Sequence, residues 1–251
     1  MSASLIGITA DFFRANIPSA ALLMAGGPAG LAWAYACLAF AGWLKRAKSL
    51  RTGYTRKVFH FLIFTSVVAI HSAWGTPAVC LFGGMATMVI IYAILRGDGH
   101  PLYEAMAREK DAPHRTHFIV APYFATLIGG LASNILFGRA AVVGYLVAGL
   151  GDAIGEPVGT RFGRHTYAVP SLRGAPSTRS WEGSAAVFLA SWLALAVALR
   201  ISPALHSHPF APLTLMALAA VSAVVEAVSP HGWDNATMQI VPTFLTTLAF
   251  C

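Results

Sequence analysis

Charged residues are scarce in this 251-residue chain: they make up 11% of it, whereas a soluble domain carries about 25%. Hydrophobic residues make up 57%, and the mean hydropathy is +0.65. A single soluble core could not hide this much apolar surface, so a soluble globular protein is excluded. Cysteine is also rare. Cys37, Cys80 and Cys251 show no paired spacing that would indicate a disulfide framework or a zinc motif.

The sequence contains several long intervals without charged residues. A helix that crosses a bilayer needs about 20 apolar residues, and charge is costly at the bilayer centre. The sequence therefore predicts an all-α fold, a polytopic transmembrane bundle of about seven or eight helices in a single domain, residues 1–251. The expected segments are 20–44, 58–74, 77–95, 116–138, 140–158, 183–200, 210–228 and 236–251. Whether 236–251 crosses the membrane fully is left open.

Basic residues are distributed unevenly between the two sides of this topology. Of the 17 Lys and Arg, 14 fall in the loops within 45–57, 96–115 and 161–179. The positive-inside rule places these loops in the cytoplasm and the amino terminus outside. The expected location is the cell inner membrane if the source is bacterial. Topology and attraction to anionic lipid explain most of this charge, so it indicates no nucleic-acid partner. No pattern indicates an oligomeric state.

Acidic residues are rarer, and half of the ten lie near helix ends on the expected cytoplasmic side. These five are Asp152, Glu156, Glu182, Glu226 and Asp234. Five carboxylates at one depth, against a basic face, indicate a polar site. An ordinary helix-end role fits Glu226 equally well.

The segment GDAIGEPVGTRFGRH, residues 151–165, combines acids, glycines and arginines. Glycine recurs every four residues, at Gly151, Gly155, Gly159 and Gly163. Asp152 and Glu156 form a parallel row beside them on a helix. Pro157 is expected to interrupt the helix, and Arg161 and Arg164 follow. Carboxylates suit Mg²⁺, while Arg and glycine amides suit phosphate oxygens. The alternative is a glycine-mediated contact between helices.

Three more clusters reach the same face. Arg56, Lys57 and His60 begin one helix, RSWEGS leads into another from Arg179, and EAVSPHGWDN runs from Glu226 to Asn235. Each is weak alone. Together, in this order and spacing, they resemble the polyprenol kinase family of integral membrane enzymes. That family includes dolichol, phytol and farnesol kinases and CTP-dependent diacylglycerol kinases, and it is related to CDP-diacylglycerol synthases.

The resemblance rests on four elements. Arg56, Lys57 and His60 resemble the family's RKxxH, and Asp234 with Asn235 resembles its late DN element. The GD element with a following FG is similar to Gly151, Asp152, Gly159, Phe162 and Gly163. The KSxEGS element is similar to Arg179, Ser180, Glu182, Gly183 and Ser184, with Arg in place of Lys.

The resemblance implies transfer of the terminal phosphoryl group, typically of CTP, to a lipid hydroxyl, with Mg²⁺ as cofactor. The nucleotide arrives from the cytoplasmic face, and the membrane supplies a prenol or diacylglycerol. The implied catalytic residues are Asp152, Glu182 and His60, and the implied metal ligands are Asp152, Glu156, Glu182 and Asp234. The implied nucleotide-binding residues are Arg56, Lys57, Gly151, Gly155, Gly159, Arg161, Gly163, Arg164, Arg179, Ser180 and Asn235.

Two other functions use similar residues. A cytidylyltransferase that forms a CDP-lipid attacks a different phosphorus and releases pyrophosphate, but the RSWEGS element and the small size favour a kinase. A transporter also places acids and glycines in broken helices, although usually near the bilayer midplane and in repeated segments. Here they lie at one face, without a repeat.

Overall fold

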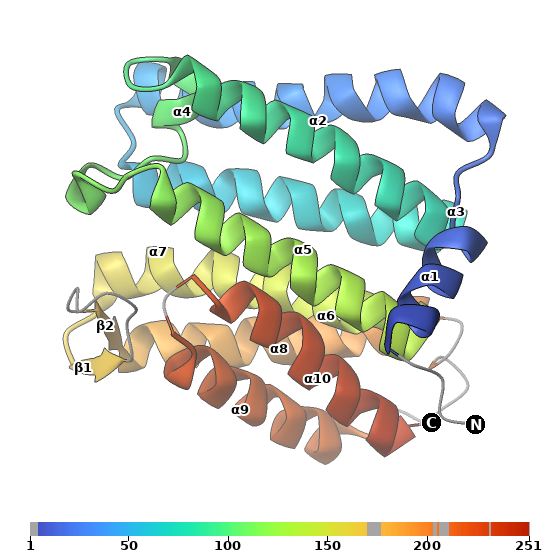
Figure 1. The fold of residues 1–251 in the computed structure, drawn as a ribbon. Helices are drawn as coiled ribbons and strands as arrows, with labels where there is room; N and C mark the ends of the chain where they lie inside the picture. The colour runs from blue at the N-terminus through green and yellow to red at the C-terminus, as the bar shows by residue number, and fades with distance from the viewer. Residues whose placement is uncertain (1–4, 170–176, 203–204, 206–210, 231, 251) are drawn as a thin grey trace.

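Helices run through nearly the whole chain, as the uncharged intervals predict. The computed structural model describes residues 5–169, 177–202, 205, 211–230 and 232–250. The long helices lie side by side, with both ends of the chain at one end of the bundle (Figure 1). The helices are α1 (Leu5–Ala15), α2 (Ala20–Lys48), α3 (Thr52–Arg96), α4 (Pro101–Glu104), η1 (Glu109–Asp111), α5 (His117–Phe137), η2 (Gly138–Ala141), α6 (Val142–Val147), η3 (Ala148–Asp152), α7 (Ala153–Phe162), α8 (Trp181–Ile201), α9 (Pro212–Val228) and α10 (Asp234–Phe250).

The 45-residue element α3 is two helices joined at a sharp turn. Gly75 has φ 73° and ψ −169°, a conformation open to glycine and strained for other residues, and Pro77 begins the second arm. Phe59 of the first arm and Ala86 of the second lie in one buried hydrophobic cluster. The two arms therefore correspond to the two segments expected at 58–74 and 77–95.

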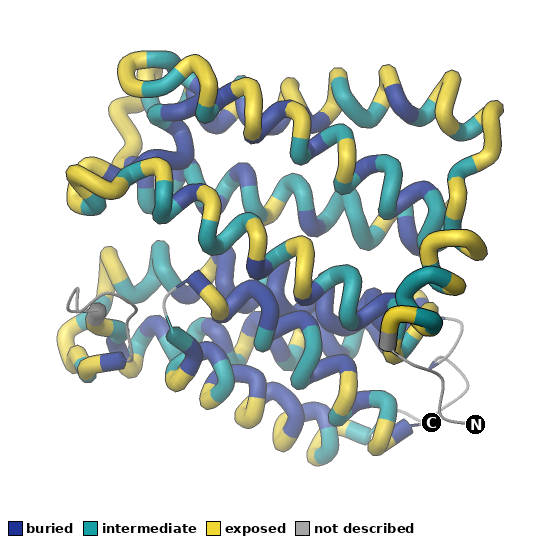
Figure 2. Tube along the Cα trace, in the orientation of Figure 1, coloured by how far each residue is buried: buried dark blue, intermediate teal, exposed yellow. Residues whose placement is uncertain are grey.

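The next long run, from α5 to α7, reverses at Gly138 and then passes through the centre of the bundle. All six residues of α6 are buried, as the dark centre of Figure 2 shows. A Cβ at Gly144 would lie 2.2 Å from the Gln239 carbonyl oxygen, so only glycine lets α6 approach α10 this closely. The π-helical turn η3 follows and ends at Asp152.

Several boundaries differ from the sequence prediction. The break expected at Pro157 is wrong: α7 continues through that residue, and the irregularity lies one turn earlier, in η3. Proline removes only one helical hydrogen bond, and a π turn can absorb a local misfit. The first arm of α3 begins at Thr52, so Arg56 is helical. Residues 210 and 251, expected in helices, lie outside the described residues.

A helix and a hairpin were not expected, and neither were the short elements α4 and η1 in the 96–115 loop. The short amphipathic helix α1 precedes the first predicted segment. An antiparallel hairpin joins α7 to α8, formed by β1 (Thr166–Val169) and β2 (Ser177–Ser180), with Thr166 paired to Ser180. The fold is otherwise all-α.

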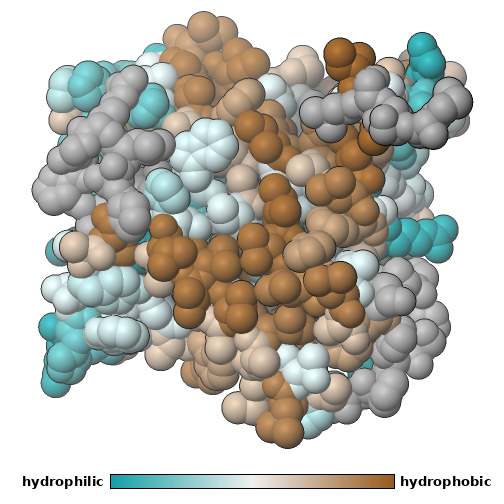
Figure 3. All heavy atoms as spheres, turned by 60° about the horizontal axis from the view of Figure 1, so that its bottom comes forward, coloured by the Kyte–Doolittle hydropathy of each residue, from teal (hydrophilic) through white to brown (hydrophobic). Residues whose placement is uncertain are grey.

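Large hydrophobic side chains cover much of the exterior. On α8 and α9, Leu189 is 62% exposed and Leu213 is 79% exposed. Figure 3 shows a broad hydrophobic surface across one face, with hydrophilic residues toward its left edge. In the described part of the chain, four helical segments are long and apolar enough to cross a membrane: α2, α3, the run His117–Phe162, and α8. Such a surface is stable in lipid and not in water, so the protein is an all-α polytopic membrane bundle.

The basic loops meet at one end of this bundle. Lys45, at the end of α2, contacts Glu109 of η1, and Arg108 reaches Glu156 of α7 with 3.4 Å between Nη1 and Oε1. Figure 1 places α4 and the hairpin at this end, opposite the chain termini. The charge asymmetry of the sequence is therefore an asymmetry between the two ends of the molecule.

Candidate active site

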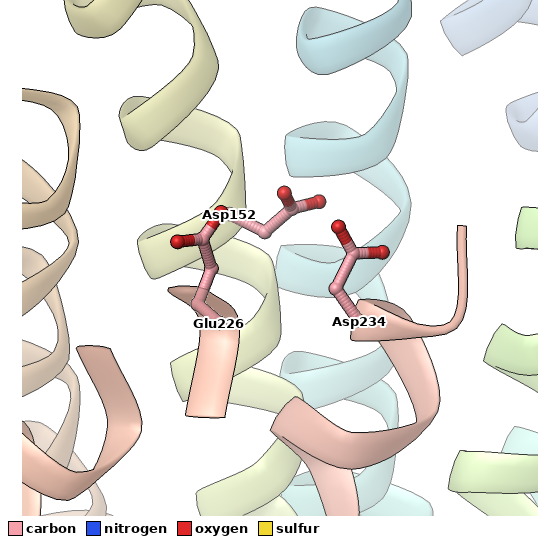
Figure 4. A group of neighbouring side chains, drawn as sticks. All are labelled: Asp152, Glu226 and Asp234. Carbon is pink, nitrogen blue, oxygen red and sulfur yellow. The ribbon is translucent and has the colours of Figure 1, made fainter. Parts of the chain in front are cut away.

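Three buried carboxylates converge at the basic end of the bundle. Asp152 ends the π turn η3, Glu226 lies in the last turn of α9, and Asp234 begins α10. One oxygen from each lies within 4.8 Å of the others, and each residue is less than 9% exposed. Figure 4 shows the three side chains pointing toward one another. Three carboxylates at this spacing form a donor set that suits a hard divalent cation.

Lys57 balances part of this charge. Its Nζ lies 2.6 Å from Asp152 Oδ1 and 3.4 Å from Glu156 Oε2, and the lysine is buried. His60 lies one turn further along α3, with Nε2 3.6 Å from Asp152 Oδ2 and 3.1 Å from the Ala148 carbonyl oxygen. A carbonyl oxygen only accepts, so this contact assigns the hydrogen of His60 to Nε2.

Arg179 forms ion pairs with the other two carboxylates, those of Glu226 and Asp234. Its Nη1 lies 3.1 Å from Glu226 Oε1, and its Nη2 donates to Asp234 Oδ2 at 3.0 Å. The next residue, Ser180, caps α8 by accepting a hydrogen bond from the Gly183 amide at 3.1 Å. The RSWEGS element therefore fixes the start of α8 and aims one guanidinium at the carboxylates.

Glu156 lies one turn beyond Asp152 but faces basic side chains. Arg56 Nη2 donates to its Oε2 at 2.7 Å, and Arg108 Nη1 lies 3.4 Å from its Oε1. Glu156 is therefore outside the group of three carboxylates. Its contacts hold the guanidiniums of α3 and the 96–115 loop in place.

Two cavities meet at the carboxylates. A polar cavity of about 270 Å³ opens among the basic residues and the starts of α7 and α8, and its lining includes Arg108, Arg179 and Glu226. An apolar cavity of about 100 Å³ lies between α3 and α5, and its lining includes Phe59 and Ile119. Both are lined by Arg56, Lys57, Asp152 and Asp234. The carboxylates thus separate a polar space from an apolar one.

Some residues expected in the site lie elsewhere. Glu182 is not part of the carboxylate group: its Oε1 lies 2.8 Å from Nδ1 of His165, which is exposed. Arg161 is exposed and lies over the Phe162 ring at 5.5 Å, and Arg164 lines neither cavity. The end of α7 points these arginines away from the carboxylates, because the helix continues past Pro157 instead of breaking there.

The glycine row of α7 packs against α8. A Cβ at Gly155 would lie 2.5 Å from Val187 Cγ2, and a Cβ at Gly163 would lie 2.7 Å from Ser180 Oγ. Gly151 faces α8 as well, with Ser191 Oγ 3.0 Å from such a Cβ. The helix-contact alternative therefore describes the row. Gly155 and Gly159 also border the polar cavity, where the missing side chains leave room.

Asn235 is buried beside Asp234 but turns its amide toward α5. Its Nδ2 donates to the Pro122 carbonyl at 3.1 Å and to Thr126 Oγ1 at 2.9 Å. Its Oδ1 is buried without a hydrogen-bond partner among the described residues. Because Asn235 lines the apolar cavity, it is a neighbour of that space and not of the polar cavity.

Sequence reasoning missed Arg108 and undervalued Glu226. Arg108 lies in a loop that matched no motif, yet it is buried and lines the polar cavity. The loop is anchored by Arg115, whose Nη2 donates to Glu104 Oε2 at 2.7 Å and lowers the pKa of that carboxyl. The cluster of charges in 96–115 was the available signal, but such clusters are common in cytoplasmic loops.

Comparison with known proteins gives two matches. A phytol kinase from Synechocystis sp. is 35% identical over 103 residues, which are 40% of this chain and 40% of the relative. A dolichol kinase from Saccharomyces cerevisiae is 24% identical over 203 residues, which are 78% of this chain and 36% of the relative. The chain is related to the polyprenol kinases. It spans less than half the length of either relative. No protein-family model and no solved structure matches it.

Proposed function

We propose that the protein is a membrane kinase that transfers the terminal phosphoryl group of a nucleoside triphosphate, CTP in our assignment, to the hydroxyl of a lipid alcohol. The observation that carries this proposal is the placement of Asp152 and Asp234 between a polar and an apolar cavity. A reaction between a water-soluble phosphate donor and a lipid needs such a boundary. The names of the two relatives, a phytol kinase and a dolichol kinase, support the same class of reaction.

The polar cavity suits a triphosphate. Among the described residues, five cationic side chains line it: Arg56, Lys57, Arg108, Lys110 and Arg179. Phosphoryl transfer asks a protein mainly for positioning and for neutralisation of charge on the phosphate oxygens. One guanidinium can donate two parallel hydrogen bonds to phosphate oxygens. Glu156 holds the guanidiniums of Arg56 and Arg108 in position before the nucleotide arrives. In the proposed topology this cavity faces the cytoplasm, where the nucleotide is found.

The three carboxylates fit Mg²⁺. Asp152, Glu226 and Asp234 bring three negative charges together, and Lys57 and Arg179 supply two positive ones. A divalent cation relieves the remaining repulsion between buried carboxylates. When bound, Mg²⁺ supplies charge neutralisation for the phosphate oxygens.

The lipid hydroxyl is assigned to the apolar side of Asp152. Asp152 Oδ1 forms an ion pair with Lys57, and Asp152 Oδ2 lies 3.6 Å from His60 Nε2. Asp152 accepts the hydroxyl proton as the alcohol oxygen bonds to the γ-phosphorus. The bond from that phosphorus to the β–γ bridging oxygen breaks, and CDP leaves on the polar side. His60 holds the backbone of η3 through Ala148 and keeps the carboxylate in place. Glu226 lines only the polar cavity, so it is assigned to the metal.

The test is to incubate purified protein in detergent with Mg²⁺, one of CTP, ATP or GTP, and one of a set of prenols or diacylglycerol. Mass spectrometry of the lipid fraction should show an alcohol monophosphate, formed with CTP and in an amount equal to the CDP released. A CDP-linked lipid together with pyrophosphate would assign the protein to the cytidylyltransferases. Absence of both products with every alcohol would contradict the proposal.

A further inference from the structure

The apolar cavity beside the carboxylates continues deeper into the bundle. A second apolar cavity, of about 270 Å³, shares five lining residues with the first: Ile63, Phe64, Ala86, Tyr123 and Thr126. The shared residues come from both arms of α3 and from α5. The two cavities therefore form one groove, which begins at Asp152 and leads away from the basic end.

The groove extends through much of the bundle. Along α5 its lining runs from Ile119, in the first cavity, to Asn134, in the second. This stretch of helix is about 22 Å long at 1.5 Å per residue. An extended chain advances about 1.2 Å per bond, so the groove fits a chain of about 18 bonds. A hydroxyl-bearing prenyl chain of four isoprene units has 16 bonds from its oxygen to the end of its main chain, about 19 Å, and fits within this length.

Several polar groups of the lining bond to one another, although Asn235 Oδ1 and Gln239 Oε1 are buried without a hydrogen-bond partner among the described residues. Thr87 Oγ1 is hydrogen-bonded to the Tyr123 hydroxyl, and Asn134 Nδ2 donates to the Gly130 carbonyl at 2.8 Å and to Tyr145. An apolar ligand thus leaves these groups paired. The groove is also open at Gly83, where an added Cβ would meet nothing within 4 Å. Space for a single chain is present between α3 and α5.

Helix α1 lies at the far end of the groove. Its Phe12 and Phe13 line the second cavity, and their rings form an edge-to-face pair with centroids 5.6 Å apart. These two rings come from the opposite end of the bundle to Asp152, and no other role is assigned to α1. A tail that passed Asn134 would meet them.

We propose that this groove binds the single hydrocarbon tail of the acceptor alcohol, and that Phe12 and Phe13 close it and so set the preferred tail length at about four isoprene units. The continuity of the groove with Asp152 argues for this occupant. A diacylglycerol carries two chains and fits poorly. The nature of the reaction at the hydroxyl rests on the proposed function, whereas the position of the tail does not.

Crosslinking tests where the lipid tail binds and does not require phosphoryl transfer. Geranylgeraniol with a diazirine at the end remote from the hydroxyl is added to the full-length protein in nanodiscs and activated by light. Mass spectrometry should find the adduct on α1 and around Asn134, and excess geranylgeraniol should compete it away. Adducts spread over exposed residues such as Leu189, without competition, would overturn the groove. Specific crosslinking without phosphorylation would instead contradict only the kinase assignment.

Two variants test the limit on tail length. Gly83→Phe fills the deep half of the groove, and we expect the ratio of kcat/KM for geranylgeraniol over geraniol to fall at least tenfold. Phe12→Ala with Phe13→Ala removes the closing rings and should raise the ratio for a C30 prenol over geranylgeraniol. The matched control, Leu189→Phe, adds a ring to an exposed position on α8 and should leave both ratios unchanged. Unchanged ratios in all variants would contradict the proposal, and crosslinking measured in each variant reports whether the groove is still occupied.

Discussion

Lys57 Nζ lies 2.6 Å from Asp152 Oδ1 in a buried ion pair that joins α3 to the π turn η3. The two side chains are 7% and 6% exposed. A buried charge that loses its partner is far less stable than a buried neutral group, so the two residues depend on each other. This pair holds the proposed proton acceptor at the boundary of the two cavities.

Removing one member of the pair should destabilise the protein more than removing both charges. Lys57→Met leaves Asp152 buried without this partner, and the free energy of unfolding should fall by about 3–5 kcal/mol. Adding Asp152→Asn should recover part of that loss. Unfolding in detergent, followed by intrinsic fluorescence, measures both variants. A double variant that is less stable than Lys57→Met alone would refute the coupling.

The two glutamates near the site should respond differently to amide substitution. Glu226→Gln removes a proposed Mg²⁺ ligand, so the Mg²⁺ concentration for half-maximal activity should rise at least about tenfold, an effect that loss of a supporting group already has at metal sites. Glu182→Gln is the matched control, since Glu182 contacts exposed His165. Titration of activity with Mg²⁺ compares them. An equal shift in the two variants would remove Glu226 from the metal site.

The glycine row makes a prediction about packing. A Cβ at Gly155 would lie 2.5 Å from Val187 Cγ2, so Gly155→Ala should lower the free energy of unfolding by about 1–3 kcal/mol through overpacking. Val187→Ala in the same chain makes room, and the double variant should lose less than the sum of the single losses. Thermal unfolding of the four proteins gives the coupling. Additive losses would show that the two helices do not meet here.

The charge asymmetry predicts the orientation in the membrane. In a chain whose cysteines are replaced by alanine, Lys110→Cys and Asp11→Cys each place one thiol at an exposed position, at opposite ends of the bundle. An impermeant maleimide added to intact cells should label position 11 and spare position 110. Labelling of position 110 from outside would invert the topology.

Much of the fold could be predicted because the bilayer imposes simple rules on sequence. Uncharged intervals located a helical counterpart for every expected segment, and the gap left between 58–74 and 77–95 contains the turn at Gly75. Helix α1 was missed because it is short and carries Asp11 and Arg14. The hairpin before α8 was missed because it has only four residues in each strand.

The candidate site was harder to predict, because side-chain direction depends on tertiary packing. Motif spacing placed Asp152, Asp234 and Arg179 at one face, and the structure brings them together. Spacing could not show that Glu182 turns toward exposed His165 while Glu226, in the last turn of α9, turns inward. It also could not show what the glycine row of α7 faces, since a helix contact and a phosphate site favour the same residues.

Transfer of labelled phosphate in the wild type and in Asp152→Asn tests the assignment of the boundary carboxylate. The substitution keeps the shape of the side chain, and Glu156 Oε2 still lies 3.4 Å from Lys57 Nζ, so the protein should fold with lower stability. Its turnover should fall by about 10² or more, because the charge of Asp152 is lost. With γ-labelled CTP, we expect label in a lipid monophosphate for the wild type and almost none for the variant. Full activity in a folded Asp152→Asn protein would remove this residue from catalysis. Lipid labelled from α-labelled CTP, and not from γ-labelled CTP, would contradict the kinase function itself.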